Sequence, residues 1–143
     1  MKNNDVSYIN DISYGYWKAQ ALFVASELDL FTLIGERGKS GKVITKKLGT
    51  NYRATEMLLN ALVSLKLLTK SRDIFRNTAV SKRCLSKNGP AYQGDRIQHF
   101  HNMWEYWSGL GTAVKSGKPT AFYNAKKGVD KKRLREFISA MHN

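Results

Sequence analysis

The order of three predicted helices constrains the fold of this chain more than any other feature. Apolar residues recur at helical spacing over Ser13–Ile34, with a bend expected near Asp29. A glycine-rich stretch separates this helix from a short helix over Val43–Leu48 and a longer one over Arg53–Leu68. A long, a short and a long helix in this order predict a helix-turn-helix unit.

Local signals after the short helix extend this prediction. Gly49 ends that helix, and Thr50 or Asn51 can cap the next one with its side-chain oxygen. Two short apolar runs, Leu67–Lys70 and Ile74–Asn77, then lie on either side of a polar triplet, which is typical of a β-hairpin. A helix-turn-helix unit followed by a hairpin predicts a winged-helix-like domain.

The chain as a whole is predicted to be mainly α, with one small hairpin and three divisions. Residues 1–12 are polar and are expected to form an N-terminal arm or a short first helix. Residues 13–90 are the winged-helix-like domain. Residues 91–143 are expected to contain a long aromatic helix over Gln93–Lys115, ended by the glycine and proline that follow, and a last helix over Lys131–Met141.

The sequence also indicates a compartment. Cys84 is the only cysteine, so no internal disulfide can form, and the first residues lack the order of a secretory signal. The apolar runs are shorter than the roughly 20 residues that a membrane span needs. We therefore expect a cytoplasmic protein that does not act on membranes.

The strongly basic composition leaves two interpretations open. Between Lys39 and Lys87 there are twelve Lys or Arg residues and only two acids, Glu56 and Asp73, a local balance of +10. Such a balance suits a winged-helix transcriptional regulator that binds DNA. The alternative, which we favour, is a solvated basic face with no specific nucleic-acid partner.

The third helix decides between these interpretations. A recognition helix needs a polar face that reads base edges and phosphates. Here apolar residues surround most of the circumference, which predicts burial against more than one layer, and Glu56 would repel phosphate. The first and long helices also carry more large apolar groups than one small core needs, which indicates an interface or a ligand groove.

No catalytic set can be assembled from this sequence. Gly38-Lys39-Ser40 lacks the earlier glycine of a phosphate-binding loop. His99 and His101 are two apart on a predicted helix and cannot share a metal ion. We therefore expect no catalytic, cofactor-binding or metal-binding residues in these 143 residues.

Four segments in order resemble the N-terminal dimerisation domain of S-adenosylmethionine (SAM)-dependent small-molecule O-methyltransferases, of the plant phenolic and bacterial polyketide type. They are Tyr16–Leu22, Ala25–Phe31, Leu58–Leu65 and Trp107–Pro119. The resemblance implies a homodimer and a small acceptor, aromatic or polyketide-like and hydroxylated. It also implies that SAM and the catalytic base belong to a C-terminal Rossmann-like domain that this chain lacks, so the chain alone is not expected to be catalytic.

The same resemblance suggests site residues. In the family, a phenylalanine and a methionine four residues apart on the last helix face the acceptor, and they correspond to Phe137 and Met141. The long helix also lines the acceptor pocket, which points to Ile97, Gln98, His101, Met103 and Trp104. The residues expected to reach the partner subunit are Tyr14, Trp17 and Phe23.

Overall fold

The computed structural model describes residues 2–118 and residue 138. It divides into two compact units, Met1–Tyr92 and Gln93–Asn143, which are described separately below. The division falls two residues after the boundary predicted at residue 90. The last predicted helix, with Phe137 and Met141, lies outside the described residues.

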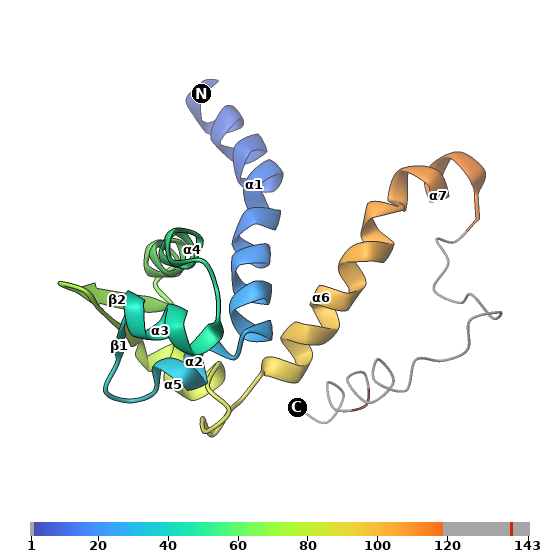
Figure 1. The fold of residues 1–143 in the computed structure, drawn as a ribbon. Coiled ribbons are helices and arrows are strands. Elements are labelled where there is room, and N and C mark those ends of the chain that lie inside the picture. Colours follow the sequence, from blue (N-terminus) through green and yellow to red (C-terminus); the bar gives the residue numbers. More distant parts are fainter. Residues whose placement is uncertain (1, 119–137, 139–143) are drawn as a thin grey trace. The chain divides into compact units, whose positions relative to one another are not determined.

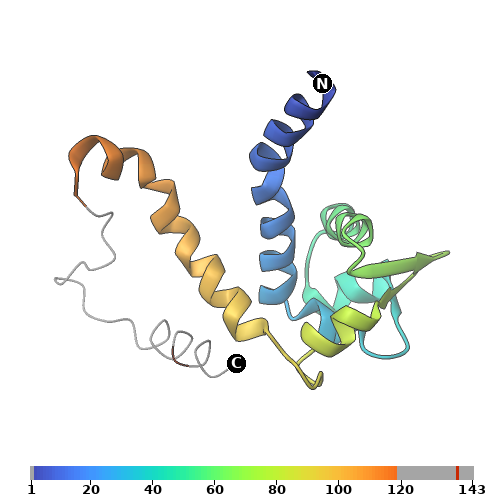
Figure 2. The same ribbon diagram turned by 180° about the vertical axis from the view of Figure 1, so that it is seen from behind.

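The first unit begins with two helices where the sequence predicted one bent helix. Helix α1 covers Lys2–Glu27 and α2 covers Leu30–Ile34. Asp29 separates them because its backbone is left-handed, with φ 50°. The stretch predicted as an arm is helical and continuous with the rest of α1. Both ribbon views show this half of α1 extending beyond α4 and the sheet (Figures 1 and 2).

Helices α3 (Gly41–Leu48) and α4 (Tyr52–Ser64) form the predicted helix-turn-helix. Gly49 ends α3 in the left-handed conformation, as the sequence predicted. Of the two possible caps of α4, the structure selects Asn51, whose Oδ1 accepts a 3.0 Å hydrogen bond from the Ala54 amide. α4 ends four residues earlier than predicted, because Leu68 is needed as the first residue of a strand.

The hairpin is confirmed, and a third strand joins it. Strands β2 (Leu68–Ser71) and β3 (Ile74–Asn77) pair antiparallel, and β1 (Lys39–Ser40) pairs with the other edge of β3. The sequence predicted only a break between helices in the β1 region. Gly38 permits the pairing because a Cβ on it would lie 2.6 Å from the Phe75 carbonyl oxygen.

The core of the first unit lies between the sheet and helices α1 to α4. Phe31 and Phe75 are its largest members, and both are fully buried. Asn77 is also buried, and its Nδ2 donates to the carbonyl oxygen of Phe31 at 2.8 Å, which holds the end of α2 against β3. The complete core cluster is Ala25, Leu30, Phe31, Ile34, Ile44, Leu59, Leu62, Leu68 and Phe75.

Helix α5 (Ala79–Cys84) follows the hairpin and is tied to the start of β2. Thr78 caps the helix, and its hydroxyl also donates to the carbonyl oxygen of Leu67. The hydroxyl of buried Ser81 donates to the same oxygen at 2.6 Å. Two hydroxyls on one carbonyl tie α5 to the residue before β2.

In the second unit the predicted long helix is two helices. α6 covers Gly94–Ser108 and α7 covers Leu110–Ser116, with the break at Gly109. Glycine is a poor residue for a helix interior, by about 1 kcal/mol relative to alanine. Gly117, with φ 64°, ends α7 as predicted.

Candidate functional site

The N-terminal half of α1 exposes apolar side chains along its length. Every residue from Asp5 to Tyr14 is exposed. Ile9 is 58% exposed and Trp17 is 56% exposed, although both are large apolar groups. Monomeric surfaces rarely gather such groups on one element, so this half of α1 is a candidate interface.

Two of the three predicted dimer contacts lie together on this helix. The rings of Tyr14 and Trp17 stack with centroids 4.6 Å apart, and Tyr16 meets Trp17 edge-on at 5.9 Å. Phe23 is half-buried and lies six residues from Trp17, which places it on a different side of α1. Tyr14, Tyr16 and Trp17 therefore form one aromatic cluster, and Phe23 is not part of it.

An apolar groove of about 400 Å³ runs between the C-terminal half of α1 and α4. The hydroxyl groups at its edge are satisfied, because Thr50 and Thr55 hydrogen-bond to each other at 2.7 Å and Thr55 donates to the Asn51 carbonyl oxygen. The groove residues are Gln20, Ala21, Val24, Leu28, Thr50, Ala54, Thr55 and Leu58. Sequence reasoning missed this groove, which has the small residues Ala21 and Ala54 on its two helices.

The prediction that α4 is buried on nearly all sides is wrong for the single chain. α4 buries Thr55, Leu59 and Leu62 on one face, while Met57 on the other side is 65% exposed. An apolar residue type gives no direction of burial by itself, and this side of α4 has no neighbouring layer within the first unit.

The exposed side of α4 carries few charges that could read DNA. Glu56 forms an ion pair with Lys70, with an N···O distance of 3.3 Å. Partial burial, with Glu56 and Asp73 nearby, raises the pKa of Tyr52 above its ordinary value of 10.0, so its phenol is neutral at physiological pH.

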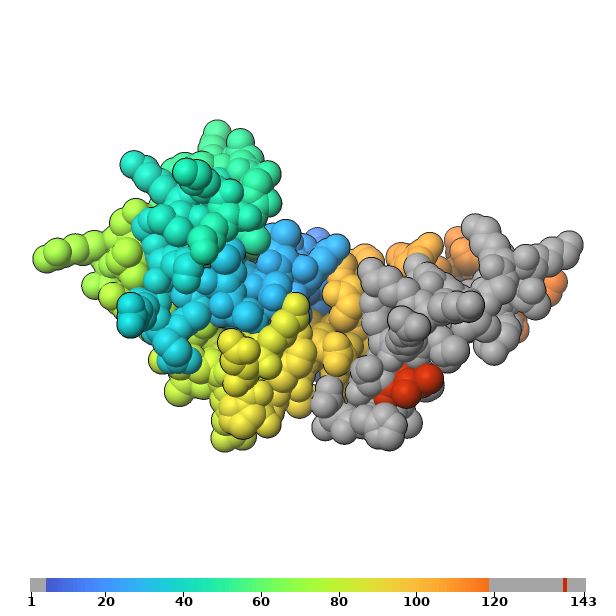
Figure 3. Space-filling view, turned by 60° about the horizontal axis from the view of Figure 1, so that its bottom comes forward, coloured from blue at the N-terminus to red at the C-terminus, as the bar shows by residue number. Residues whose placement is uncertain are grey.

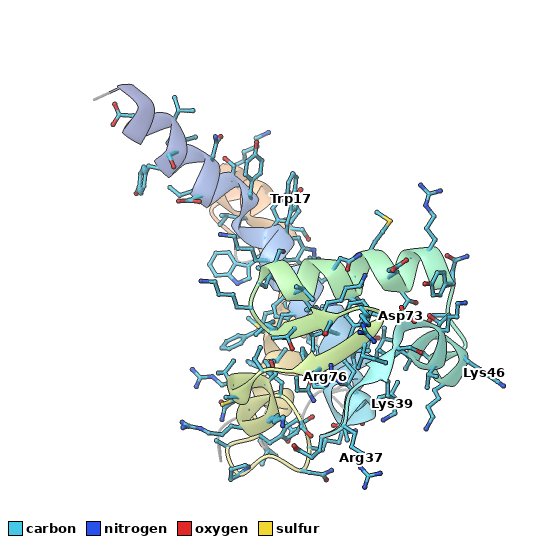
Figure 4. All side chains as sticks on the ribbon, turned by 90° about the vertical axis from the view of Figure 1, so that its left-hand side faces the viewer. Trp17, Arg37, Lys39, Lys46, Asp73 and Arg76 are labelled. Atoms are coloured by element: carbon cyan, nitrogen blue, oxygen red, sulfur yellow. The ribbon has the colours of Figure 1, made fainter. Side chains whose placement is uncertain are left out.

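The basic residues of the first unit come from several elements. Figure 4 shows Arg37, Lys39 and Arg76 near one another at the lower edge of the sheet, with Lys46 farther away on α3. The wing formed by β2 and β3 extends from the body in the space-filling view (Figure 3). The positive charge is thus spread over loops, α3 and the wing, and is not gathered on one reading helix.

Some of these cations are paired within the unit. Lys82 pairs with Glu36 at 2.7 Å and Lys87 with Asp29 at 2.8 Å. Lys39 donates to the carbonyl oxygen of Ile34 at 3.1 Å. Exposed pairs of this kind contribute about 0 to 1 kcal/mol each, so they shape the surface more than they stabilise the fold.

In the second unit, α6 carries the residues expected at the acceptor pocket. Ile97, His101 and Trp104 follow at intervals of four and three residues, so they share one face of the helix, with Gln98 at its edge. Met103 lies on another side. Ile97 is buried, Gln98, His101 and Met103 are half-buried, and Trp104 is 41% exposed.

Within residues 2–118 and 138, no three His, Cys, Asp or Glu side chains are placed to hold a metal ion. No helix in this described part is long and apolar enough to cross a membrane.

Comparison with known proteins identifies relatives for most of the chain. Residues 10–87 match the model of the O-methyltransferase dimerisation domain. Acetylserotonin O-methyltransferase of Gallus gallus is 33% identical over 85% of this chain and 37% of its own length. The 3-hydroxy-5-methyl-1-naphthoate 3-O-methyltransferase of Streptomyces sahachiroi is 33% identical over 78% of this chain and 33% of its own length.

A solved structure agrees with these relatives. Human N-acetylserotonin methyltransferase, in complex with SAM, superimposes with a TM-score of 0.82 at 25% identity. The match covers 96% of this chain and 44% of the human chain. This chain therefore spans well under half the length of the relatives that it matches.

Proposed function

The chain belongs to the O-methyltransferase dimerisation domain family, and we propose that it pairs two copies of a SAM-dependent O-methyltransferase. The observation that carries this proposal is the exposed apolar half of α1, with Trp17 56% exposed at its aromatic cluster. Removing such side chains from water gains roughly 25 cal/mol per Å² of apolar surface. A second copy of the chain is the partner that we assign to this surface.

The acceptor in our proposal is a small hydroxylated metabolite, aromatic or polyketide-like. Two matched relatives are named for aromatic acceptors, acetylserotonin and a hydroxynaphthoate. We assign the acceptor surface to the α6 residues Ile97, Gln98, His101, Met103 and Trp104, together with Phe137 and Met141 outside the described residues. A flat apolar acceptor suits the aromatic and aliphatic groups in this set.

We place SAM and the catalytic base outside these 143 residues. The described residues do not fit the cofactor, because their sheet is short and antiparallel and has no parallel strand that leads into a glycine-rich turn. The role that we assign to this chain is to hold two subunits together and to shape the acceptor pocket. We expect the whole enzyme in the cytoplasm, where Cys84 stays reduced.

Sedimentation analysis of the 143-residue chain tests the pairing. We expect a dimer at micromolar concentration, because intertwined interfaces bury on the order of 2,000 to 5,000 Å². A chain that sediments as a monomer at that concentration contradicts the proposal.

A second test concerns the basic surface. We propose that it has no specific nucleic-acid partner, so any DNA binding should be weak and should fall steeply between about 50 and 200 mM salt. Fluorescence anisotropy with duplexes of different sequence measures this. Sequence-selective nanomolar binding at physiological salt would instead support a winged-helix regulator.

A further inference from the structure

Asp29 forms the joint between α1 and α2, and its carboxylate does not cap the helix that it precedes. It is the N-cap residue of α2, a position where an aspartate usually accepts a hydrogen bond from an amide of the first turn. Within the described residues, the Asp29 side chain makes no such cap bond. Its Oδ2 instead accepts from Nζ of Lys87 at 2.8 Å, 58 residues later in the chain. The N-cap carboxylate thus holds a distant segment.

A second contact joins the same two places. Thr32 lies in α2, and its Oγ1 accepts a 2.9 Å hydrogen bond from the backbone amide of Lys87. Asp29 and Thr32 are the N-cap residue and the third residue of α2, two positions whose side chains lie close together at the start of a helix. Lys87 is therefore held by its side chain and its backbone at once, which fixes it better than a single exposed ion pair would.

The backbone at the joint is strained. Asp29 has φ 50° and ψ 36°, in the left-handed region that residues other than glycine enter at a cost, although aspartate enters it more readily than most. Its amide donates to the carbonyl oxygen of Ser26, and its own carbonyl oxygen accepts from the Leu33 amide, both at 3.0 Å. One residue thus makes the turn between two helices and also the contact with Lys87.

Lys87 belongs to the segment through which the chain leaves the first unit. That unit ends at Tyr92, so we call residues 85–92 the exit segment. Within it, the Gly89 amide donates to the carbonyl oxygen of Ser86 at 2.8 Å. Gly89 also lies so close to α5 that a Cβ on it would overlap the Lys82 carbonyl oxygen. The exit segment is therefore a compact loop against the end of α5, and Lys87 joins it to the start of α2.

We propose that Lys87 is a clasp that couples the α1–α2 joint to the exit segment. When the clasp is closed, it holds the exit segment and gives the strained Asp29 its partner. When it opens, both places lose a contact in one event. Its two hydrogen bonds are exposed, and exposed contacts are weak, so it can open while the core stays folded. All of its atoms belong to one chain, so the clasp does not depend on the proposed dimer.

The exit segment gives the clasp its consequence for the second unit. It leads directly into α6, which begins at Gly94 and carries the residues that we assign to the acceptor surface. With the clasp closed, the chain enters α6 from a fixed point on the first unit. With the clasp open, it enters α6 from a loose loop. The clasp is thus a conformational device at the connection between the two units.

Hydrogen exchange of the 143-residue chain, followed amide by amide by NMR, tests the coupling. Lys87→Met removes the charged end of the side chain and keeps its apolar part. The amides of Gly89 and Leu33 should then both exchange about fivefold faster, because the exit segment and the joint open more often. Lys87→Arg keeps a cation at this position, so both rates should stay within about twofold of those in the unmodified chain.

Lys82→Met is the matched control. Lys82 lies on α5 and pairs with Glu36 at 2.7 Å, so this change removes an ion pair of the same kind from outside the clasp. The amides of Gly89 and Leu33 should keep their exchange rates. Sodium chloride at about 0.5 M should speed both amides in the unmodified chain and have no further effect in Lys87→Met, because salt screens exposed ion pairs.

Three results would overturn the clasp. In the first, Lys87→Met leaves both rates unchanged, or salt has no effect on the unmodified chain. In the second, Gly89 responds to Lys87→Met and Leu33 does not, because the exit segment and the joint then open separately. In the third, Lys82→Met speeds the same amides as much as Lys87→Met does, because the loss of any ion pair then loosens the unit. Circular dichroism checks that each variant keeps its helix content.

Discussion

The body of the first unit and the first half of α1 both contain large apolar side chains, yet only the body buries them within the chain. In the body, Phe31 and Phe75 are fully buried, and the buried amide of Asn77 donates to a backbone carbonyl. In the first half of α1, Ile9 is as apolar as any core residue and remains exposed. The comparison teaches that one region is complete within a chain, whereas the other is the region that the proposed dimer would complete.

The largest effect should come from shortening a core side chain in the body of the first unit. Phe75→Ala removes a fully buried ring from β3, the strand between β1 and β2, and should lower the free energy of unfolding by about 3 to 5 kcal/mol. Denaturant unfolding measures it, with Val80→Ala at an exposed apolar position on α5 as the control. A loss below 1 kcal/mol would show that the body is not the stable part of the unit.

Shortening a side chain of the aromatic cluster should lower dimer affinity more than it lowers the stability of the folded chain. Trp17→Ala should weaken the dimer by about 2 kcal/mol, which is about 30-fold in its dissociation constant, because a central aromatic anchor is lost. Sedimentation equilibrium measures this change, and Val80→Ala on α5 is the control at another exposed apolar position. Unfolding curves at several protein concentrations separate dissociation from unfolding, since only dissociation depends on concentration. Unchanged dimer affinity would remove Trp17 from the interface.

The smallest effect concerns the helix itself. Gly15 lies inside α1, and a Cβ added to it would have no neighbour within 4 Å. Gly15→Ala should therefore stabilise α1 by up to about 1 kcal/mol. It should leave the proposed dimer intact, because positions 15 and 17 are two apart and lie on nearly opposite sides of the helix. Thermal unfolding and sedimentation of the variant measure the two quantities. A weaker dimer would show that the glycine side of α1 contacts the second copy.

Local signals in the sequence were sufficient for the main architecture. Apolar residues at helical spacing predicted α3 and α4. Gly49 and Asn51 marked the turn between them, and the polar triplet marked the hairpin. The features that were missed depend on contacts between distant residues. β1 exists because Gly38 lets the chain approach Phe75, which is 37 residues later, and α4 ends early because Leu68 pairs with Asn77.

The candidate surfaces were predictable to different degrees. Tyr14 and Trp17 were identified by residue type, and the structure stacks them. Phe23 is also aromatic, but the helix places it on a different side of α1 from Trp17, where it is half-buried. The groove could not be derived, because an alanine in a helix has the same pattern whether it faces a neighbour or an open space between two helices.

The position of the exposed segment at the start of the chain has a consequence during synthesis. A ribosome makes about 5 to 20 residues per second, so Val6 emerges some 3 to 10 s before Leu58, which completes the groove. During that interval the segment has no folded body on its own chain beside it. The acids Asp5 and Asp11 lie among its apolar residues and keep the nascent helix hydrated. Neighbouring ribosomes on one message carry older chains with the same exposed segment, so the proposed pairing could begin before synthesis ends.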